Sequence, residues 1–350
     1  MSSEAITSRA KTKPYAPITI WRAILTLQIV MVHCFAIYSS SWEFEFGENT
    51  LPYVPAYSWV NPFMAIFALQ GFFFISGYLS SMKRKEEVPH EYLHFVKKKF
   101  SRLYFPSIIF SLLYLYFFTG HPTWGDVGYA AFSGKGHLWF LPTLFWVAVI
   151  YESVACWASR HKYIVLIGFF ILAYLGFLIG VLFSDLPINL FVRVTKYLFF
   201  YALGACLWQE RTERTSGSDI DREPLWHVVG IFASGLLLWL TSYTSLWGLL
   251  GNGIISKTYT AGLDPLIALL MIIGMYKSWM MLDVRTPDLE VSSVISRFSR
   301  DSFAIYILHQ FVLYELIFRS PELLKGFSIG GVLGSILIYC HSDCRIQPNY

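Results

Sequence analysis

Long apolar runs recur along almost the whole chain and constrain its fold more than any other feature. The length of each run is close to that of a helix that crosses the hydrocarbon core of a bilayer, about 20 residues. The ten runs are residues 18–39, 62–82, 103–119, 138–157, 163–183, 190–208, 228–247, 262–281, 302–318 and 326–340. They are continuously apolar rather than alternating, which favours membrane-spanning helices over the strands of a barrel.

The composition agrees with a membrane protein. Of the 350 residues, 55% are hydrophobic and only 14% are charged, whereas an ordinary soluble domain has about 25% charged residues. This shortage of charge excludes a disordered or coiled-coil protein and disfavours a soluble enzyme. The formal net charge is only +4, so nucleic acid is not an expected partner. Cys34, Cys156 and Cys206 lie inside apolar runs, so a disulfide scaffold is not indicated.

We therefore predict an all-α polytopic membrane protein with about ten transmembrane helices in one bundle. Ten spans use about 200 residues, which leaves no room for a second folded domain. Residues 1–17 are expected to form a cytoplasmic N-terminal tail, 18–340 the transmembrane domain and 341–350 a C-terminal tail. The first apolar run is too long for a cleaved signal peptide and has no small-residue cleavage site.

The placement of Lys and Arg predicts that both termini are cytoplasmic, because cytoplasmic loops carry an excess of these residues. If the N-terminus is inside, six of the 27 Lys and Arg residues lie on the outer side: Lys135, Arg193, Lys196, Lys257, Arg319 and Lys325. The others all lie on the inner side. An odd number of spans would scramble this split, so it also supports the count of ten.

Ionisable groups inside an apolar run need a partner or a function, because lipid does not solvate them. The first run carries Arg22 and His33, which are 11 positions apart. At 100° per residue, both side chains lie on one helix face, about 16 Å apart along the axis. From these residues alone, a snorkelling arginine with a packing histidine explains the pair as well as a functional site does.

Two segments lie toward the predicted inner side of the membrane. Ser76 and Gly77 in the second run allow close approach of another helix or a local break. The basic segment KKKFSRLYFP leads into the third run and contains Lys98 and Arg102. These cations set topology, and they also suit the phosphates of an anionic substrate.

Two other segments carry polar groups within or beside apolar runs. In HLWFL, His137 and Trp139 fit an aromatic belt at the outer boundary, and they also suit a surface for a sugar ring. In SFAIYILHQ, Ser302 and His309 share a helix face and Tyr306 is adjacent. A second histidine inside a span favours a polar interior over packing alone.

The spacing of Arg22 and His33 resembles the arginine–histidine signature of the acyltransferase 3 family of integral membrane acyltransferases. Five other segments are similar to motifs of that family and follow in the same order: FFFISGYL (72–79), KKKFSRLYFP (97–106), HLWFL (137–141), YLFFYALGACL (197–207) and SFAIYILHQ (302–310). The resemblance covers about residues 18 to 320. Each motif is weak alone, but six in order, with ten spans and an inside N-terminus, are specific.

The resemblance implies an enzyme that moves an acyl group, usually acetyl and sometimes succinyl, from cytoplasmic acyl-CoA to an envelope or secreted carbohydrate. Acyl-CoA, most simply acetyl-CoA, is then a co-substrate rather than a permanently bound cofactor. The acceptor is a polysaccharide or a lipid-linked glycan, and the location is the bacterial inner membrane. The chain departs from the pattern in lacking a fused extracytoplasmic domain, so a stand-alone form is expected.

The resemblance also assigns roles. His33 and Arg22 are expected to be catalytic, with His33 acting as a general base or as an acyl carrier. Arg102, Lys98 and Ser76 are expected to bind acyl-CoA. The acceptor is expected to contact four residues: His137, Trp139, Tyr306 and His309. No metal site is expected, because the ligands of the C-terminal tail are too few to close one.

Three alternatives to an O-acetyltransferase remain open. Succinyl transfer to a glucan is one, because CFAIYSSSW (34–42) loosely resembles the glucan-modifying branch of the family. The second is a transporter, although no related halves are visible and Asp264 is the main acidic residue in a span. The third is a polysaccharide exporter or scaffold without catalytic activity.

Overall fold

The structure is a computed structural model that describes residues 15–39, 53–86, 92–119, 121–182, 189–214, 224–244, 254–286 and 289–319. Within these ranges the regular elements are helices and there is no strand, which confirms the all-α prediction. The predicted tenth span, the predicted C-terminal tail and nearly all of the predicted N-terminal tail lie outside the described residues.

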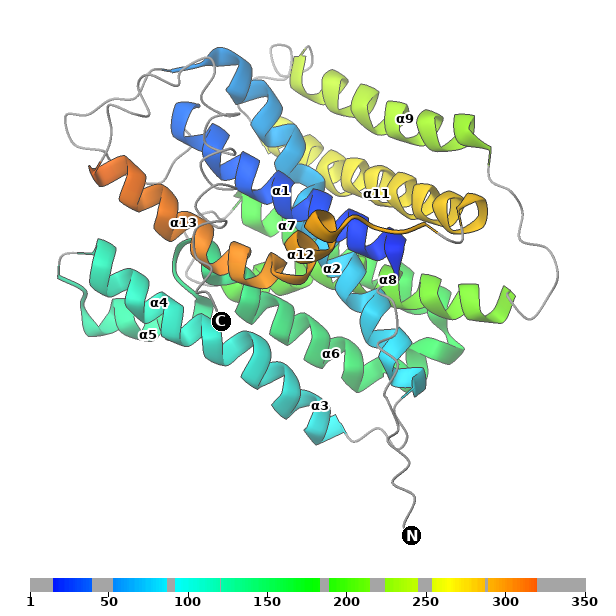
Figure 1. The fold of residues 1–350 in the computed structure, drawn as a ribbon, viewed down its shortest axis with the longest axis horizontal. Coiled ribbons are helices and arrows are strands. Elements are labelled where there is room, and N and C mark those ends of the chain that lie inside the picture. Colours follow the sequence, from blue (N-terminus) through cyan, green and yellow to red (C-terminus); the bar gives the residue numbers. More distant parts are fainter. Residues whose placement is uncertain are drawn as a thin grey trace, which may run out of the picture.

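The described helices pack side by side in one bundle (Figure 1). They are α1 (Ala16–Tyr38), α2 (Pro55–Glu86), α3 (Tyr92–Lys99), α4 (Phe105–Phe118), α5 (Trp124–Ser133), α6 (Phe140–Arg160), α7 (Lys162–Leu182), α8 (Asn189–Arg214), α9 (Leu225–Thr244), α11 (Ile254–Arg285), α12 (Ser293–Arg300) and α13 (Ser302–Arg319). Two short turns complete the set: the π-helical η1 (Phe100–Tyr104) and the 3₁₀ η2 (Gly136–Trp139). Helices α9 and α11 pack together at one side, and α3, α4 and α5 lie at the other.

Nine of the ten predicted spans coincide with described helices. Seven helical segments are long and apolar enough to cross a membrane: Ala16–Tyr38, Pro55–Arg84, Tyr92–Phe118, Gly136–Arg160, Lys162–Gly180, Leu190–Glu213 and Gly262–Arg285. Shorter apolar segments lie in α9 (Leu225–Thr241) and α13 (Ser302–Ile317). The described residues therefore form an integral membrane protein, and the predicted count of about ten spans agrees with these helices.

The outer face of α7 shows what surrounds the bundle. Ile164, Ile167 and Ile171 are 60%, 62% and 53% exposed and lie one turn apart along the helix. A continuous aliphatic row of this kind is costly in water and stable against lipid tails.

The third span begins earlier than predicted. One helical segment runs from Tyr92 to Phe118, so the basic residues 97–102 lie within it rather than before it. The π-helical turn η1 interrupts its regular hydrogen bonding just before Pro106. Long basic side chains at a helix end reach the membrane interface, which lets the helix extend beyond the apolar run.

The segment between the third and fourth predicted spans, residues 120–136, contains the helix α5. Thr123 caps it, because its Oγ1 accepts from the backbone N–H of Asp126 at 3.2 Å. The Asp126 carboxylate accepts in return from the backbone N–H of Thr123 at 2.9 Å. This reciprocal cap stabilises a short helix that hydrophobicity alone does not reveal.

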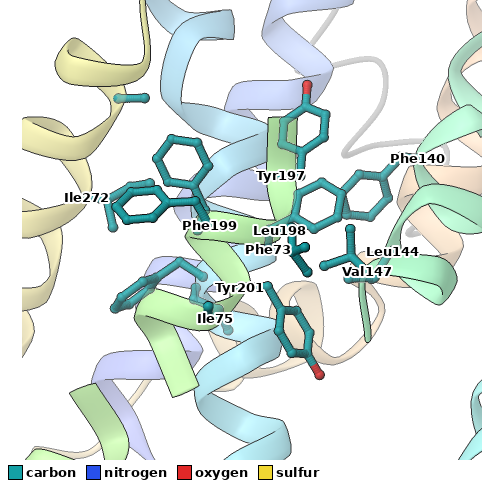
Figure 2. Packing of buried hydrophobic residues seen from close by; sticks show 14 of the residues in the cluster. Phe73, Ile75, Phe140, Leu144, Val147, Tyr197, Leu198, Phe199, Tyr201 and Ile272 are labelled. Carbon is teal, nitrogen blue, oxygen red and sulfur yellow. The ribbon is translucent and has the colours of Figure 1, made fainter. Parts of the chain in front are cut away.

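Helix α8 is at the centre of the core. Tyr197 of α8 stacks on Phe73 of α2 with ring centroids 4.4 Å apart and an interplanar angle of 8°. Figure 2 shows these two rings beside Phe140 of α6, while Phe199 points toward Ile272 of α11. Aromatic side chains thus join four helices around one buried layer.

Two glycines allow α2 and α8 to approach closely. A Cβ atom on Gly77 would overlap the carbonyl oxygen of Tyr201, and one on Gly204 would overlap that of Phe74. The close helix approach predicted for Ser76-Gly77 is therefore confirmed at Gly77. Small residues at such crossings let backbones touch, which is how membrane helices gain packing energy.

Ion pairs join the helices at the end of the bundle where α1 begins. Arg211 of α8 pairs with Asp283 of α11 and donates to the hydroxyls of Tyr15 at 2.6 Å and Tyr78 at 3.0 Å. A charge in this setting is stable only when it is paired and hydrogen-bonded.

Arg84 of α2 forms a second pair, with Glu152 of α6. The two pairs together join α2 to α6 and α8 to α11.

Candidate active site

Helix α1 presents Arg22 and His33 to α13. Near the start of α1, Arg22 Nη2 donates to Ser302 Oγ at 2.8 Å. Further along, His33 Nδ1 lies 3.2 Å from Nε2 of His309. The shared face predicted from the spacing is therefore confirmed. The two contacts also show that α1 and α13 run parallel, as the first and ninth spans of an alternating chain must.

Three histidine rings from three elements meet beyond the middle of α1. The ring centroid of His309 lies 4.8 Å from that of His33 and 4.7 Å from that of His137. His137 and His309 are 4% and 0% exposed, whereas His33 is half-buried. His137 is thus inside the bundle, and the aromatic-belt interpretation of this residue is wrong. Within the described residues, no group of His, Cys, Asp and Glu has the arrangement of a metal site.

Hydrogen-bond partners determine which nitrogen of each ring carries the proton. His309 Nδ1 faces the carbonyl oxygens of Ile305 at 3.1 Å and Tyr306 at 2.7 Å, so it donates and its Nε2 accepts. His33 Nδ1 faces that Nε2 and the carbonyl oxygen of Ile29 at 2.8 Å. Both are acceptors, so Nδ1 of His33 carries the proton. The lone pair of the neutral His33 ring then lies on Nε2.

His137 is held differently. Its Nε2 lies 3.0 Å from the carbonyl oxygen of Ile307 and its Nδ1 lies 2.8 Å from the side-chain amide of Gln310. The Gln310 atom nearest Nδ1 is Oε1, and a neutral ring can donate to only one of two oxygens. Both contacts are satisfied when Nε2 donates to Ile307 and the Gln310 amide is turned over, so that its nitrogen donates to Nδ1. The backbone oxygen of His137 also accepts from the Tyr306 hydroxyl. These bonds use both ring nitrogens, so His137 supports the site rather than offering a base.

A cavity of about 120 Å³ lies against the His33 ring. Its walls are Ile29, Val32 and His33 of α1, Ala65, Ala68 and Leu69 of α2, His137 and Trp139 of η2, and Tyr306 of α13. A reactive imidazole therefore borders a small space with mainly apolar walls, in which charge and hydrogen bonds act more strongly than in water.

Trp139 is fixed at this cavity by residues of α8. The guanidinium carbon of Arg193 lies 4.6 Å from the centroid of the Trp139 ring, within cation–π range. Tyr197 stacks on the same ring at 5.8 Å and 27°. These contacts give the indole one orientation.

The residues predicted to bind acyl-CoA lie elsewhere. Lys98 is half-buried on α3 and Arg102 is exposed on η1, and both elements pack against α6. Ser76 is half-buried on α2, next to the α2–α8 crossing at Gly77. The structure thus does not gather these three residues into one group with His33.

The structure does bring together five residues singled out from the sequence. Four of them line the cavity: His33, His137, Trp139 and Tyr306. His309 supports His33 from behind. Sequence reasoning missed Gln310 and the α2 wall, Ala65, Ala68 and Leu69. Gln310 could have been found as the polar neighbour of His309, whereas nothing in the α2 sequence distinguishes the wall from ordinary packing residues.

Comparison with known protein families identifies the family of the chain. Residues 16–340 match the acyltransferase 3 family, which is described as an acyltransferase domain. The chain belongs to the acyltransferase 3 family. No curated protein and no solved structure matches it. As a member of this family the chain is an integral membrane transferase, which has an acyl donor and an acceptor as its partners.

Proposed function

We propose that this acyltransferase moves a short acyl group, acetyl first, from acyl-CoA on the cytoplasmic side to a hydroxyl of an envelope or secreted carbohydrate. The observation that carries the proposal is the His33 ring. It borders a cavity while Ile29 and His309 hold its Nδ1 proton, so that Nε2 is the basic atom. A base fixed in one tautomer beside a small cavity suits proton abstraction from an incoming hydroxyl.

The proposed reaction has one acyl transfer and two proton transfers. The acceptor oxygen forms a bond to the thioester carbonyl carbon as its proton passes to His33 Nε2. The carbon–sulfur bond then breaks, and the CoA thiolate takes the proton from His33. The products are an ester and free CoA. In the intermediate stage the His33 cation is stabilised through Nδ1 by Ile29 and His309, the role that an orienting group has beside a catalytic histidine.

The donor enters from the end of the bundle where α1 begins. Arg22 lies on the same face as His33, nearer that end, and Ser302 fixes its guanidinium. Arginine donors suit phosphate oxygens, so Arg22 is assigned to the donor. Arg102 on η1 and Lys98 on α3 are proposed as further contacts to the donor phosphates, and Ser76 remains a candidate donor contact.

The acceptor approaches on the Trp139 side of the cavity. The indole of Trp139 offers a flat apolar surface on which a sugar ring can lie, and it borders the same cavity as His33. The Tyr306 hydroxyl donates to the backbone oxygen of His137, and the His137 ring bonds to Gln310, so these two side chains shape this side rather than take up protons. His309 acts through His33.

Two measurements test the proposal. Mass spectrometry of envelope glycans from cells with and without this protein should show acetyl esters that disappear when the gene is removed. Purified protein should turn over acetyl-CoA in the presence of the glycan, and vesicles that contain it should show no glycan or ion uptake. Uptake without turnover would show a transporter, and neither activity would favour a scaffold.

A further inference from the structure

The cavity beside His33 has a wall too apolar for a sugar. Ile29 and Val32 of α1 face Ala65, Ala68 and Leu69 of α2 across it. Five of its nine lining side chains are therefore aliphatic and offer no hydrogen bond. A sugar ring placed here would bring several hydroxyls that need partners.

Two of the polar side chains at the cavity, His137 and Tyr306, do not supply those partners. The two ring nitrogens of His137 bond to Ile307 and Gln310, and the Tyr306 hydroxyl bonds to the His137 backbone oxygen. Each buried hydroxyl left without a partner costs about 1–3 kcal/mol. The space consequently suits the alkyl part of an acyl group, with its carbonyl carbon near His33.

We propose that this cavity is the acyl pocket and that it selects a short uncharged acyl group, acetyl, over butyryl and succinyl. The inference rests on the proposed function and names the donor class that the site accepts. An apolar cavity of about 150 Å³ holds benzene, which has six heavy atoms. The cavity here is about 120 Å³, which at the same ratio holds fewer than about five heavy atoms. The three heavy atoms of acetyl therefore fit, whereas the five of butyryl and the seven of succinyl do not.

The charge of the succinyl group is a second, independent reason why the cavity favours acetyl. Of the nine lining residues that the structure describes, none is Lys or Arg. The distal carboxylate of a succinyl group would be buried against Leu69 and the alanines without a cation, which is costly. Size and charge therefore both exclude the dicarboxylic donor, and the acetyl alternative is favoured over the succinyl one.

Leu69 is the side chain whose removal should enlarge the pocket. It is half-buried on α2 and is the largest aliphatic group that this helix contributes to the cavity. Ile66, three residues earlier, is also half-buried on α2 but does not line the cavity. Leu69→Ala and Ile66→Ala remove side chains of equal size and so form a matched pair.

The test measures binding of free CoA, acetyl-CoA, butyryl-CoA and succinyl-CoA to the purified full-length protein by calorimetry, without an acceptor. Wild type should bind acetyl-CoA about fourfold more tightly than CoA, the gain from burying one methyl group. Butyryl-CoA and succinyl-CoA should bind no more tightly than CoA. Leu69→Ala should make butyryl-CoA at least about tenfold tighter than CoA, whereas Ile66→Ala should keep the wild-type order.

The other possible results contradict either the acyl pocket alone or the proposed function as well. Equal binding of all four ligands by wild type, or no change of order in Leu69→Ala, would overturn the acyl pocket and leave the proposed function standing. Absence of binding by any acyl-CoA would overturn the proposed function and the pocket with it. If Leu69→Ala is not monodisperse, Ala65→Val replaces it. That variant fills the pocket, so acetyl-CoA should no longer bind more tightly than CoA. If acetyl-CoA still binds more tightly, the assignment of the cavity as the acyl pocket is wrong.

Discussion

Replacing His309 tests how the catalytic histidine is supported. In the structure the Nδ1 proton of His33 is shared between two acceptors, the Ile29 carbonyl at 2.8 Å and His309 Nε2 at 3.2 Å. His309→Ala removes the longer bond and leaves the shorter one. The tautomer of His33 is therefore retained, and the expected loss is that of one neutral hydrogen bond, about 0.5–1.5 kcal/mol. This corresponds to roughly a 2- to 13-fold decrease in kcat.

Two further variants separate positioning from packing. His309→Gln can place its amide oxygen near the position of Nε2, which accepts from His33, whereas His309→Asn places its amide near Nδ1, which faces Ile305 and Tyr306. We expect Gln to restore kcat more than Asn does, at similar melting temperatures. The assay is acetyl-CoA turnover by purified protein, with KM measured alongside kcat.

The reasoning would be refuted in either of two ways. Equal kcat for the Gln and Asn variants would show that the bond to His33 does not matter. A loss far above 100-fold in His309→Ala, with the fold intact, would show that His309 acts on the substrate itself.

Three other predictions follow from the fold and the charge pattern. Gly77→Ala should lower the free energy of unfolding by about 1–3 kcal/mol, because a Cβ atom there overlaps the Tyr201 carbonyl oxygen. Gly128→Ala is the control and should not lower it, because nothing lies within 4 Å of a Cβ atom at that position. Thermal unfolding in detergent measures both variants. Arg102→Ala should raise the KM for acetyl-CoA and change the salt dependence of that KM. Arg300→Ala removes an exposed arginine that pairs with Asp301 at 2.9 Å, and it should leave the KM unchanged. An unchanged KM in Arg102→Ala would remove Arg102 from the donor site. Reporter fusions at Gly134 and Ser218 should give opposite signals, and equal signals would contradict ten spans.

Much of the fold follows from the sequence because lipid imposes a simple rule. A run of about 20 apolar residues must become a helix there, since its backbone has no other hydrogen-bond partners. The shared face of Arg22 and His33 followed for the same reason, because helical periodicity is fixed. Helix α5 did not follow, because its signal is the cap between Thr123 and Asp126 rather than a hydrophobic run.

The site could be predicted only in part. Periodicity placed Tyr306 and His309 on α13, but it could not bring His137 to them, because that contact joins residues about 170 positions apart. The α2 wall of the cavity could not be predicted from the sequence for a related reason. Alanine and leucine in a span are ordinary, and only the packing of α2 against α1 makes Ala65 and Leu69 part of a pocket.

The ion pairs at the end of the bundle were also missed. The sequence places Arg211 among the inner-side cations and gives no signal for Asp283, because each residue lies near the end of its span and nothing local marks its partner. In the structure they close a network with Tyr15 and Tyr78. Long-range pairing of this kind depends on which helices are neighbours, and that is decided by crossings such as the one at Gly77.

The most direct test of the account is acetyl transfer by His33→Ala. Purified, monodisperse wild type, His33→Ala and His161→Ala should be compared with acetyl-CoA and the glycan acceptor; His161 is an exposed histidine and serves as the control. Loss of a general base typically costs about 10²–10⁴ in rate, so His33→Ala should lose at least 100-fold while His161→Ala keeps wild-type activity. Full activity in His33→Ala would contradict the mechanism.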